Sequence, residues 1–285
     1  MHVTMLLILL GSALVSWSIG RIVLPFGMTF LRHHTVIEKN YLGEDIPTGY
    51  GIVLLFAFAP AYTLIAPFFL FRLSQLGDGS LFWAVGVASL WMVLLGWLDD
   101  TLGDHRAKGF KGHLALLRQD GVFTTGLLKA IGGGGAAFAV ASVTGDNGFE
   151  WIVHGFLIAL TTNWINLLDL RPGRALKFYL LGAFSLFLIA WLQPYTVSFV
   201  PLMLIALATL KADLAGRLML GDSGANLLGM QLGIFAASAL PLYVSVGIVL
   251  LLFVGHVYAE RHSLTELIVR ISWLNKLDNW GRVKP

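Results

Sequence analysis

The sequence predicts an all-α, polytopic integral membrane protein, and three observations lead to this fold class. Hydrophobic residues make up 57% of the 285 residues and charged residues only 12%, whereas a soluble domain has about 25% charged residues. The mean hydropathy is +0.78. The apolar stretches are long enough for helices, which need about 20 residues to cross a bilayer, and they lack the short alternating pattern of a β-barrel.

About nine membrane spans are expected within residues 1–258, which form one transmembrane domain. Pro194 and Pro241 divide neighbouring apolar stretches. The first stretch has no basic start and no convincing cleavage site, so we interpret it as a retained span and not as a signal peptide. The expected spans cover residues 3–20, 50–71, 81–98, 123–144, 150–168, 176–193, 195–210, 224–240 and 241–258.

The basic residues predict how these spans are oriented. Of the 19 Lys and Arg residues, 17 fall on the side of the odd-numbered connections and the tail, counting Lys177 just inside the sixth span; Lys129 lies inside the fourth span and Arg72 falls on the even side. By the positive-inside rule, the odd connections and the carboxy terminus are cytoplasmic and the amino terminus is outside. The sequence therefore predicts a multi-pass protein of the plasma membrane.

Residues 259–285 are expected to form a cytoplasmic amphipathic tail. Ser263 and Glu266 fit a capping box, and apolar residues recur at helical spacing as far as Leu277. Charged residues interrupt this segment too often for a membrane span, so a surface helix in the cytoplasmic interface is predicted.

Four consecutive glycines, Gly132 to Gly135, lie inside the fourth span. Because glycine has no side chain, such a run lets two helix backbones approach each other, and we expect a close helix–helix contact here. A hinge is the alternative.

The composition excludes several functions. Without cysteine the chain has no disulfide, no thiolate metal site and no cysteine nucleophile. A formal charge of +3 is too small to indicate nucleic acid as a partner.

Three polar groups fall on the predicted cytoplasmic side, where we expect them to meet and to build a site for a metal ion and phosphates. Two adjacent carboxylates that end a span repel each other and resist leaving water, so a cation is expected nearby. Asparagines at a spacing of three share one helical face. The three groups are Asp99 with Asp100, Asn163 with Asn166 and Asp169, and Gly221 with Asp222 and Ser223.

Each group also has a purely structural interpretation. The acidic pair fits a solvated helix end, the asparagines fit hydrogen bonds between helices, and Asp222 or Ser223 fits a helix cap. The backbone amides that open the eighth span equally make an anion site, with Asp222 beside them to hold a cation. Lys129 either snorkels to the cytoplasm or neutralises a phosphate or the aspartate pair.

Carboxylate and amide oxygens suit Mg²⁺ better than Zn²⁺, with Mn²⁺ as a substitute. Magnesium commonly binds one or two protein oxygens together with substrate phosphates. The residues alone therefore indicate a membrane enzyme, or a binder, of phosphorylated substrates.

Five motifs, taken together in order and spacing, resemble the polyprenyl-phosphate N-acetylhexosamine-1-phosphate transferases of bacterial cell-envelope synthesis. The resemblance covers about residues 40 to 235. The motifs are Pro47-Thr48-Gly49-Tyr50-Gly51, Gly96-Trp97-Leu98-Asp99-Asp100, Gly126-Leu127-Leu128-Lys129, the segment 163–169, and Met219-Leu220-Gly221-Asp222-Ser223-Gly224.

The resemblance implies transfer of a sugar 1-phosphate from a UDP-sugar to a polyprenyl phosphate, with release of UMP, in a bacterial membrane. It implies that Asp99 and Asp100 serve the lipid-phosphate acceptor, and that Asp222 is catalytic and binds magnesium with Asn166. Lys129 would bind phosphate. Further substrate contacts are expected from Asn163, Asp169, Arg171, Arg174, Gly221, Ser223 and His262. The expected partners are a polyprenyl phosphate, a nucleotide sugar and membrane lipids, and a homodimer is compatible with the sequence.

Two departures from the family pattern support an alternative. The loop after Asp169 contains Arg171 and Arg174 where the family carries a second acidic or amide position, and these arginines fit either phosphate binding or membrane anchoring. The family's histidine-rich last loop is reduced to His262, with His256 before it. The alternative is a family member that binds lipid phosphate or a nucleotide sugar in a regulatory or scaffold role. A secondary transporter ranks third, because the internal repeats common in transporters are missing.

Overall fold

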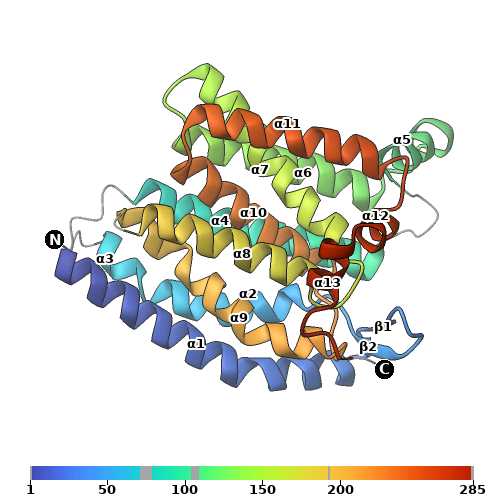
Figure 1. Cartoon of the computed structure of the whole chain (residues 1–285), viewed down its shortest axis with the longest axis horizontal. Helices are drawn as coiled ribbons and strands as arrows, with labels where there is room; N and C mark the ends of the chain where they lie inside the picture. The colour runs from blue at the N-terminus through green and yellow to red at the C-terminus, as the bar shows by residue number, and fades with distance from the viewer. Residues whose placement is uncertain (1, 71–78, 104–108, 192, 284–285) are drawn as a thin grey trace.

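The computed structural model describes residues 2–70, 79–103, 109–191 and 193–283, which form a bundle of helices with one small antiparallel sheet (Figure 1). Arg72 lies outside the described residues. The elements are α1 (His2–His33), β1 (Ile37–Lys39), β2 (Asp45–Pro47), α2 (Gly51–Thr63), α3 (Ala66–Leu70), α4 (Ser80–Leu102), α5 (Gly109–Asp120), α6 (Thr125–Thr144), α7 (Gly148–Leu168), α8 (Arg174–Ala190), η1 (Pro194–Ser198), α9 (Val200–Leu214), α10 (Gly221–Ala239), α11 (Leu242–Ala259), α12 (Leu264–Arg270) and α13 (Ser272–Asn279).

Five helices of the described residues are long and apolar enough to cross a membrane, namely α1, α4, α6, α7 and α11. Their outer faces carry large apolar side chains, and Leu251 of α11 is 71% exposed. Such faces suit lipid and not water. The chain is therefore an all-helical membrane protein. Three of the other expected spans coincide with helices of only 13, 17 and 15 residues, α2, α8 and α9.

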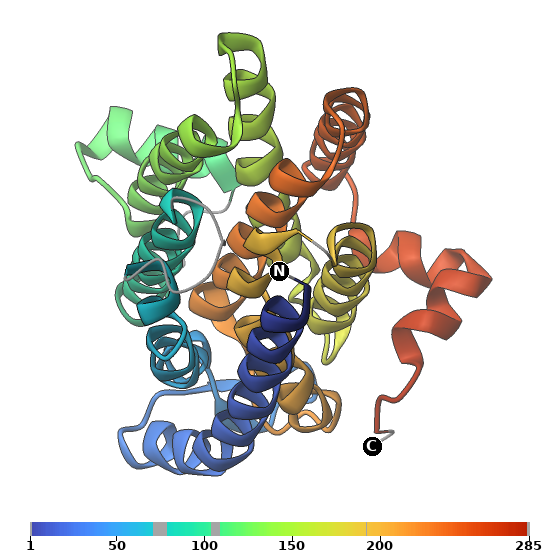
Figure 2. The ribbon, with the colours of Figure 1, turned by 90° about the vertical axis from the view of Figure 1, so that its left-hand side faces the viewer.

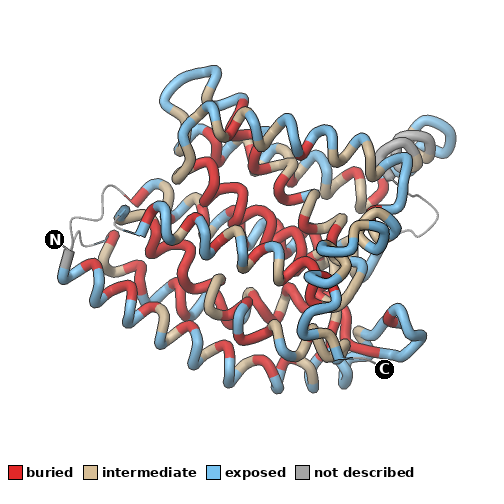
Figure 3. The backbone as a smooth tube through the Cα atoms, viewed as in Figure 1, coloured by how far each residue is buried: buried red, intermediate tan, exposed pale blue. Residues whose placement is uncertain are grey.

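The fourth remaining span, α10, is the central helix of the bundle. It packs against α2, α4, α6, α7 and α8, and every residue from Ser223 to Ala237 is buried. Figure 2 shows the orange α10 inside the ring of the other helices, and Figure 3 shows the buried backbone concentrated along this line. Because its neighbours shield it from lipid, α10 tolerates polar residues such as Asn226 and Gln231.

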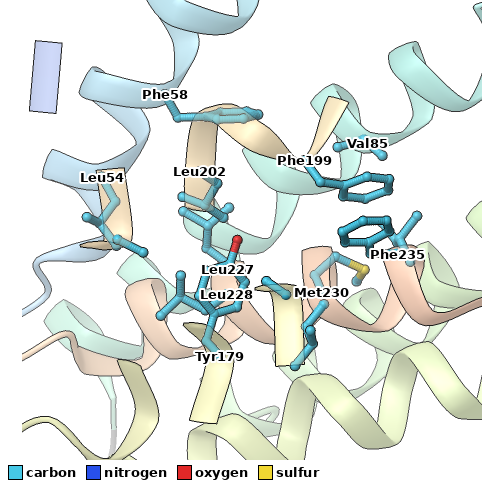
Figure 4. Packing of buried hydrophobic residues seen from close by; sticks show 14 of the residues in the cluster. Leu54, Phe58, Val85, Tyr179, Phe199, Leu202, Leu227, Leu228, Met230 and Phe235 are labelled. Atoms are coloured by element: carbon cyan, nitrogen blue, oxygen red, sulfur yellow. The ribbon is translucent and has the colours of Figure 1, made fainter. Parts of the chain in front are cut away.

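Close packing and buried hydrogen bonds join α10 to its neighbours. Figure 4 shows the rings of Phe199 and Phe235 face to face, with centroids 4.3 Å apart. The Gln231 side-chain amide donates to the Ser89 hydroxyl of α4 at 2.9 Å. Lipid tails are as apolar as leucine, so in a membrane such contacts, and not removal from water, stabilise helix association.

The glycine run of α6 serves as a helix contact only in its first half. A Cβ on Gly132 would lie 2.8 Å from Cδ1 of Leu95, and one on Gly133 would lie 3.2 Å from Cε of Met92, both on α4. A Cβ on Gly134 or Gly135 would meet nothing within 4 Å. The predicted close contact is therefore confirmed for the first two glycines and wrong for the last two.

The carboxy-terminal tail differs from the single surface helix predicted. Ser263 caps α12 as expected, since its hydroxyl accepts the Glu266 amide at 3.3 Å. The helix then breaks at Ile271, which has extended backbone angles, and resumes as α13. Figure 1 places both helices beside the ends of α8 and α9. We call this end of the bundle, which also carries β1, β2 and α5, the polar end.

Ion pairs hold the tail on the bundle. The Arg174 guanidinium at the start of α8 donates to both carboxylate oxygens of Asp278, at 2.8 and 3.0 Å, and Arg282 lies 3.1 Å from the same carboxylate. The Lys177 ammonium donates to the Leu277 carbonyl at 2.8 Å. Burial alone would raise the pKa of the Asp278 carboxyl, but the hydrogen bonds and charges of the two arginines hold this pKa below its usual range.

Candidate functional site

Lys129 joins two aspartates from two other helices at the polar end. Its ammonium lies 2.6 Å from Oδ2 of Asp99, near the end of α4, and 2.5 Å from Oδ2 of Asp222, at the start of α10. Thr125, one turn earlier on α6, donates its hydroxyl to Oδ1 of Asp99 at 2.5 Å. We call Asp99, Lys129 and Asp222 the ionic triad. An ammonium has three N–H groups, so one donor of Lys129 is left after both carboxylates are bound.

Asp100 binds the start of α10. Its carboxylate accepts the backbone amides of Asp222 and Ser223 at 2.7 and 3.0 Å, and the Ser223 hydroxyl at 2.8 Å. A carboxylate in this position satisfies free amides and complements the positive end of the helix dipole. The anion bound by the amides of Asp222 and Ser223 is therefore the carboxylate of Asp100. The adjacent residue, Asp99, has a different partner, the ammonium of Lys129.

Glycines allow the motif segments to come this close. Gly221 has φ +67°, and a Cβ there would lie 2.8 Å from both carboxylate oxygens of Asp100. A Cβ on Gly96 would collide with the backbone of Ser223. The segment before α2 also joins, because the Met219 amide donates to the Pro47 carbonyl at 2.8 Å.

The third polar group reaches the same place through Asp169, the residue that ends α7. Its carboxyl lies beside the Gly221 amide and near the carboxyls of Asp213, Asp222 and Asp100. Burial first, and then these neighbouring carboxyls, raise the pKa of Asp169 well above its usual value, and the Gly221 amide opposes this only in part. Four carboxyls share this place with the single ammonium of Lys129, so a cation bound here would favour their ionised forms.

A cleft of about 520 Å³ adjoins the ionic triad between α6, α7, α10 and α11. Lys129, Asn163, Asn166 and Gly134 line it. Among the described residues, neither asparagine side chain has a hydrogen-bond partner, so both amides are available to a ligand. Lys129 is the member of the triad that lines this cleft.

Two further residues line the cleft, Asn226, which the sequence analysis missed, and His256, which it noted only beside the reduced histidine loop. Asn226 is 3% exposed, and its Nδ2 is buried without a hydrogen-bond partner in the described part of the chain. His256 lies 2.7 Å through Nδ1 from the Leu252 carbonyl, so Nδ1 donates to that oxygen, and Nε2 is also buried without a partner among the described residues. The available signal was a polar residue inside an apolar span, which is costly without a function.

Asp213, the last missed residue, is 3% exposed near the end of α9. Its Oδ2 accepts the Gly173 amide at 2.9 Å, which holds the loop between α7 and α8. An acid at the end of an apolar helix was the only signal in the sequence.

Three predicted substrate contacts have other partners. The Arg171 guanidinium lies over the Tyr41 ring, 4.7 Å from its centroid. Arg174 is buried against Asp278 in the tail. His262 is exposed and stacks on Tyr258 with ring centroids 4.7 Å apart. The structure therefore brings together the acidic, amide and lysine residues, while these three residues lie with the hairpin, the tail and α11.

The donor set suits a magnesium ion that shares its ligands with a substrate. No group of three or more His, Asp or Glu side chains in the described residues is arranged to hold a metal ion. Asp222 nevertheless keeps Oδ1 free of Lys129, and Asn166 offers an amide oxygen in the adjoining cleft. Magnesium needs few protein ligands when phosphates and water supply the others. Carboxylate and amide oxygens are the kinds of ligand that such an ion takes.

Fold and site together define a helical membrane protein with an acidic, lysine-bridged site at the polar end of the bundle. No known family model matches the chain, and no curated protein matches it either. The order of the motifs and the geometry of the site therefore carry the functional argument.

Proposed function

We propose that this protein transfers a sugar 1-phosphate from a UDP-sugar to a polyprenyl phosphate at the cytoplasmic face of a bacterial plasma membrane and releases UMP for cell-envelope glycan synthesis. One observation carries this proposal: Lys129 links carboxylates from α4 and α10 and also lines a cleft between membrane helices. A cation at the junction of an acidic cluster and a largely apolar cleft between membrane helices suits a reaction between a water-soluble diphosphate and a lipid phosphate.

The proposal includes nine membrane crossings, with the polar end on the cytoplasmic side. The positions of the basic residues support this orientation. In this orientation the ionic triad faces the cytoplasm, which supplies nucleotide sugars, and the cleft lies at the depth of the inner leaflet.

In the proposed reaction, an oxygen of the acceptor phosphate attacks the β-phosphorus of the donor, and the bond from that phosphorus to the bridging oxygen breaks so that UMP leaves. The free N–H of Lys129 binds the acceptor phosphate. Asp99, held by Lys129 and Thr125, serves the acceptor as a base or as an orienting group. Asp222 and Asn166 would hold magnesium, which would supply charge neutralisation for the diphosphate. Asp100 keeps Asp222 in position, and Asn163 and Asp169 bind the donor.

A glycine in the lining of the cleft leaves room for the prenyl chain. Gly134 lines the cleft and has open space where a side chain would be. We expect Gly134→Leu to raise the KM for polyprenyl phosphate about tenfold or more, because the leucine fills the cleft. Gly135→Leu is the matched control, since Gly135 has the same open space but is exposed. Equal KM values for the two variants would place the lipid elsewhere.

Turnover by the purified protein tests the proposed function directly. The protein in detergent is incubated with polyprenyl phosphate, magnesium and a panel of nucleotide sugars, and release of nucleoside monophosphate is followed. We expect release that requires both the lipid and magnesium. A chelator should stop it and added magnesium should restore it.

A regulatory or scaffold role is the second candidate, and one observation favours it. Arg171 and Arg174, at the loop expected to hold the nucleotide sugar, are engaged by Tyr41 and Asp278. Saturable binding of a nucleotide sugar without product, for every donor in the panel, would select this candidate over the transferase.

A further inference from the structure

A second cleft, of about 390 Å³, lies outside the site described above, between the end of α9 and the tail. Its walls are mostly apolar, and two basic residues stand among them. The residues that matter for its chemistry are Leu207, Leu210, Leu214, Val283, Lys211 and Arg217.

The cleft has an apolar part, the leucines of α9, that suits an acyl chain, and a basic part, Lys211 and Arg217, that suits an anionic head group. Leu207 is 46% exposed on the outer face of α9, and Lys211 follows four residues later on the same helical face. Lys211 and Arg217 are both exposed, and neither forms an ion pair with an acidic residue of the described chain. By contrast, Arg174 is already paired with Asp278.

The tail forms one wall of this cleft. The Val283 amide donates to the Leu214 carbonyl at 3.2 Å, and Gly281 packs against the Leu214 side chain. Between them, Arg282 points the other way and donates to the Pro172 carbonyl at 3.2 and 3.1 Å. The same short segment therefore closes the cleft and contacts the loop that follows Asp169.

We propose that this cleft binds an anionic phospholipid, with its phosphate between Lys211 and Arg217 and an acyl chain along the leucines of α9. Basic pockets between membrane helices bind anionic head groups. The bound lipid contacts both α9 and the tail, so it stabilises the docked tail by mass action. The proposal goes beyond the transferase function and does not depend on it.

Hydrogen exchange of the tail amides tests the proposal in reconstituted vesicles. We compare phosphatidylcholine alone with phosphatidylcholine containing phosphatidylglycerol. Each basic residue near an anionic surface contributes roughly a fivefold preference, so exchange at residues 277–283 should slow by about tenfold or more with phosphatidylglycerol. Equal exchange in both vesicles would overturn the proposal.

Matched variants locate the effect. The double variant Lys211→Gln with Arg217→Gln should lose the slowing, and it alters only exposed side chains, so the fold is retained. The control, Arg270→Gln with Lys276→Gln, removes the same charge from exposed tail positions outside the cleft. This control should keep the slowing of exchange by phosphatidylglycerol. Loss in the control as well would assign the effect to general surface charge and refute the site.

Two further experiments distinguish binding of a phospholipid from binding of a soluble phosphate. Glycerol phosphate added to phosphatidylcholine vesicles should not slow exchange, because it lacks the acyl chain. If it does, the cleft recognises a free phosphate and the lipid proposal fails. Native mass spectrometry should show phosphatidylglycerol retained by the wild-type protein and lost from the Lys211→Gln, Arg217→Gln variant; equal retention by both would contradict the proposal.

Discussion

Asp222→Asn and Asp99→Asn are each expected to lower turnover by about 10²- to 10³-fold, the range seen when one preorganised hydrogen-bonding group is removed from an active site. Each change removes one of the two carboxylates that hold the Lys129 ammonium. The lysine then loses its position, and the site loses a base or a metal ligand. Release of UMP from a UDP-sugar in detergent is the measurement.

Asp146→Asn provides a control for these two variants. Asp146 is exposed in the turn between α6 and α7, at the other end of the bundle, so turnover should be unchanged. Thermal unfolding should show that both site variants remain folded. Wild-type turnover in either would remove that aspartate from the mechanism, even if the protein proves to be a transferase.

Asp100→Ala is expected to act on the fold more than Asp99→Asn does. Asp100 accepts three hydrogen bonds from Asp222 and Ser223, and its loss leaves amides at the start of α10 without an acceptor. Hydrogen bonds to a charged group contribute about 1.5–3 kcal/mol each, so we expect a loss on the order of 3 kcal/mol. Turnover should fall too, because Asp222 is displaced.

Thermal unfolding in detergent checks this result, with Ser223→Ala as a graded comparison. That variant removes one of the three hydrogen bonds and should cost about 1.5 kcal/mol. Equal melting temperatures for wild type and Asp100→Ala would show that Asp100 does not hold α10, and the division of roles between the two aspartates would have to be abandoned.

The positions of the helices could largely be predicted from the sequence, because length and apolar composition determine a membrane helix. The expected spans 150–168 and 241–258 correspond closely to α7 and α11. Helix α1 runs to His33 instead of residue 20, since packing along α9 and α2 continues it beyond the first apolar run. The tail could not be predicted, because its shape depends on the pairing of Arg174 with Asp278.

The meeting of Asp99, Asp222 and Asp169 at one end could be expected from topology alone. The different partners of Asp99 and Asp100 could not, since adjacent helical residues point about 100° apart and only the neighbouring helices decide which partner each one finds. For the same reason Asn226 was missed and His256 could not be placed in the cleft, because their unpartnered side-chain atoms result from packing between helices.

The central position of α10 also has a consequence for how the protein is made. A segment carrying Asp222, Asn226 and Gln231 partitions poorly from the translocon into lipid by itself. Its shielding neighbours α4, α6, α7 and α8 all precede it in the chain, so they have left the ribosome when it emerges. We infer that α10 enters the bilayer by assembling onto helices already inserted, and that biogenesis of the site waits for this late step.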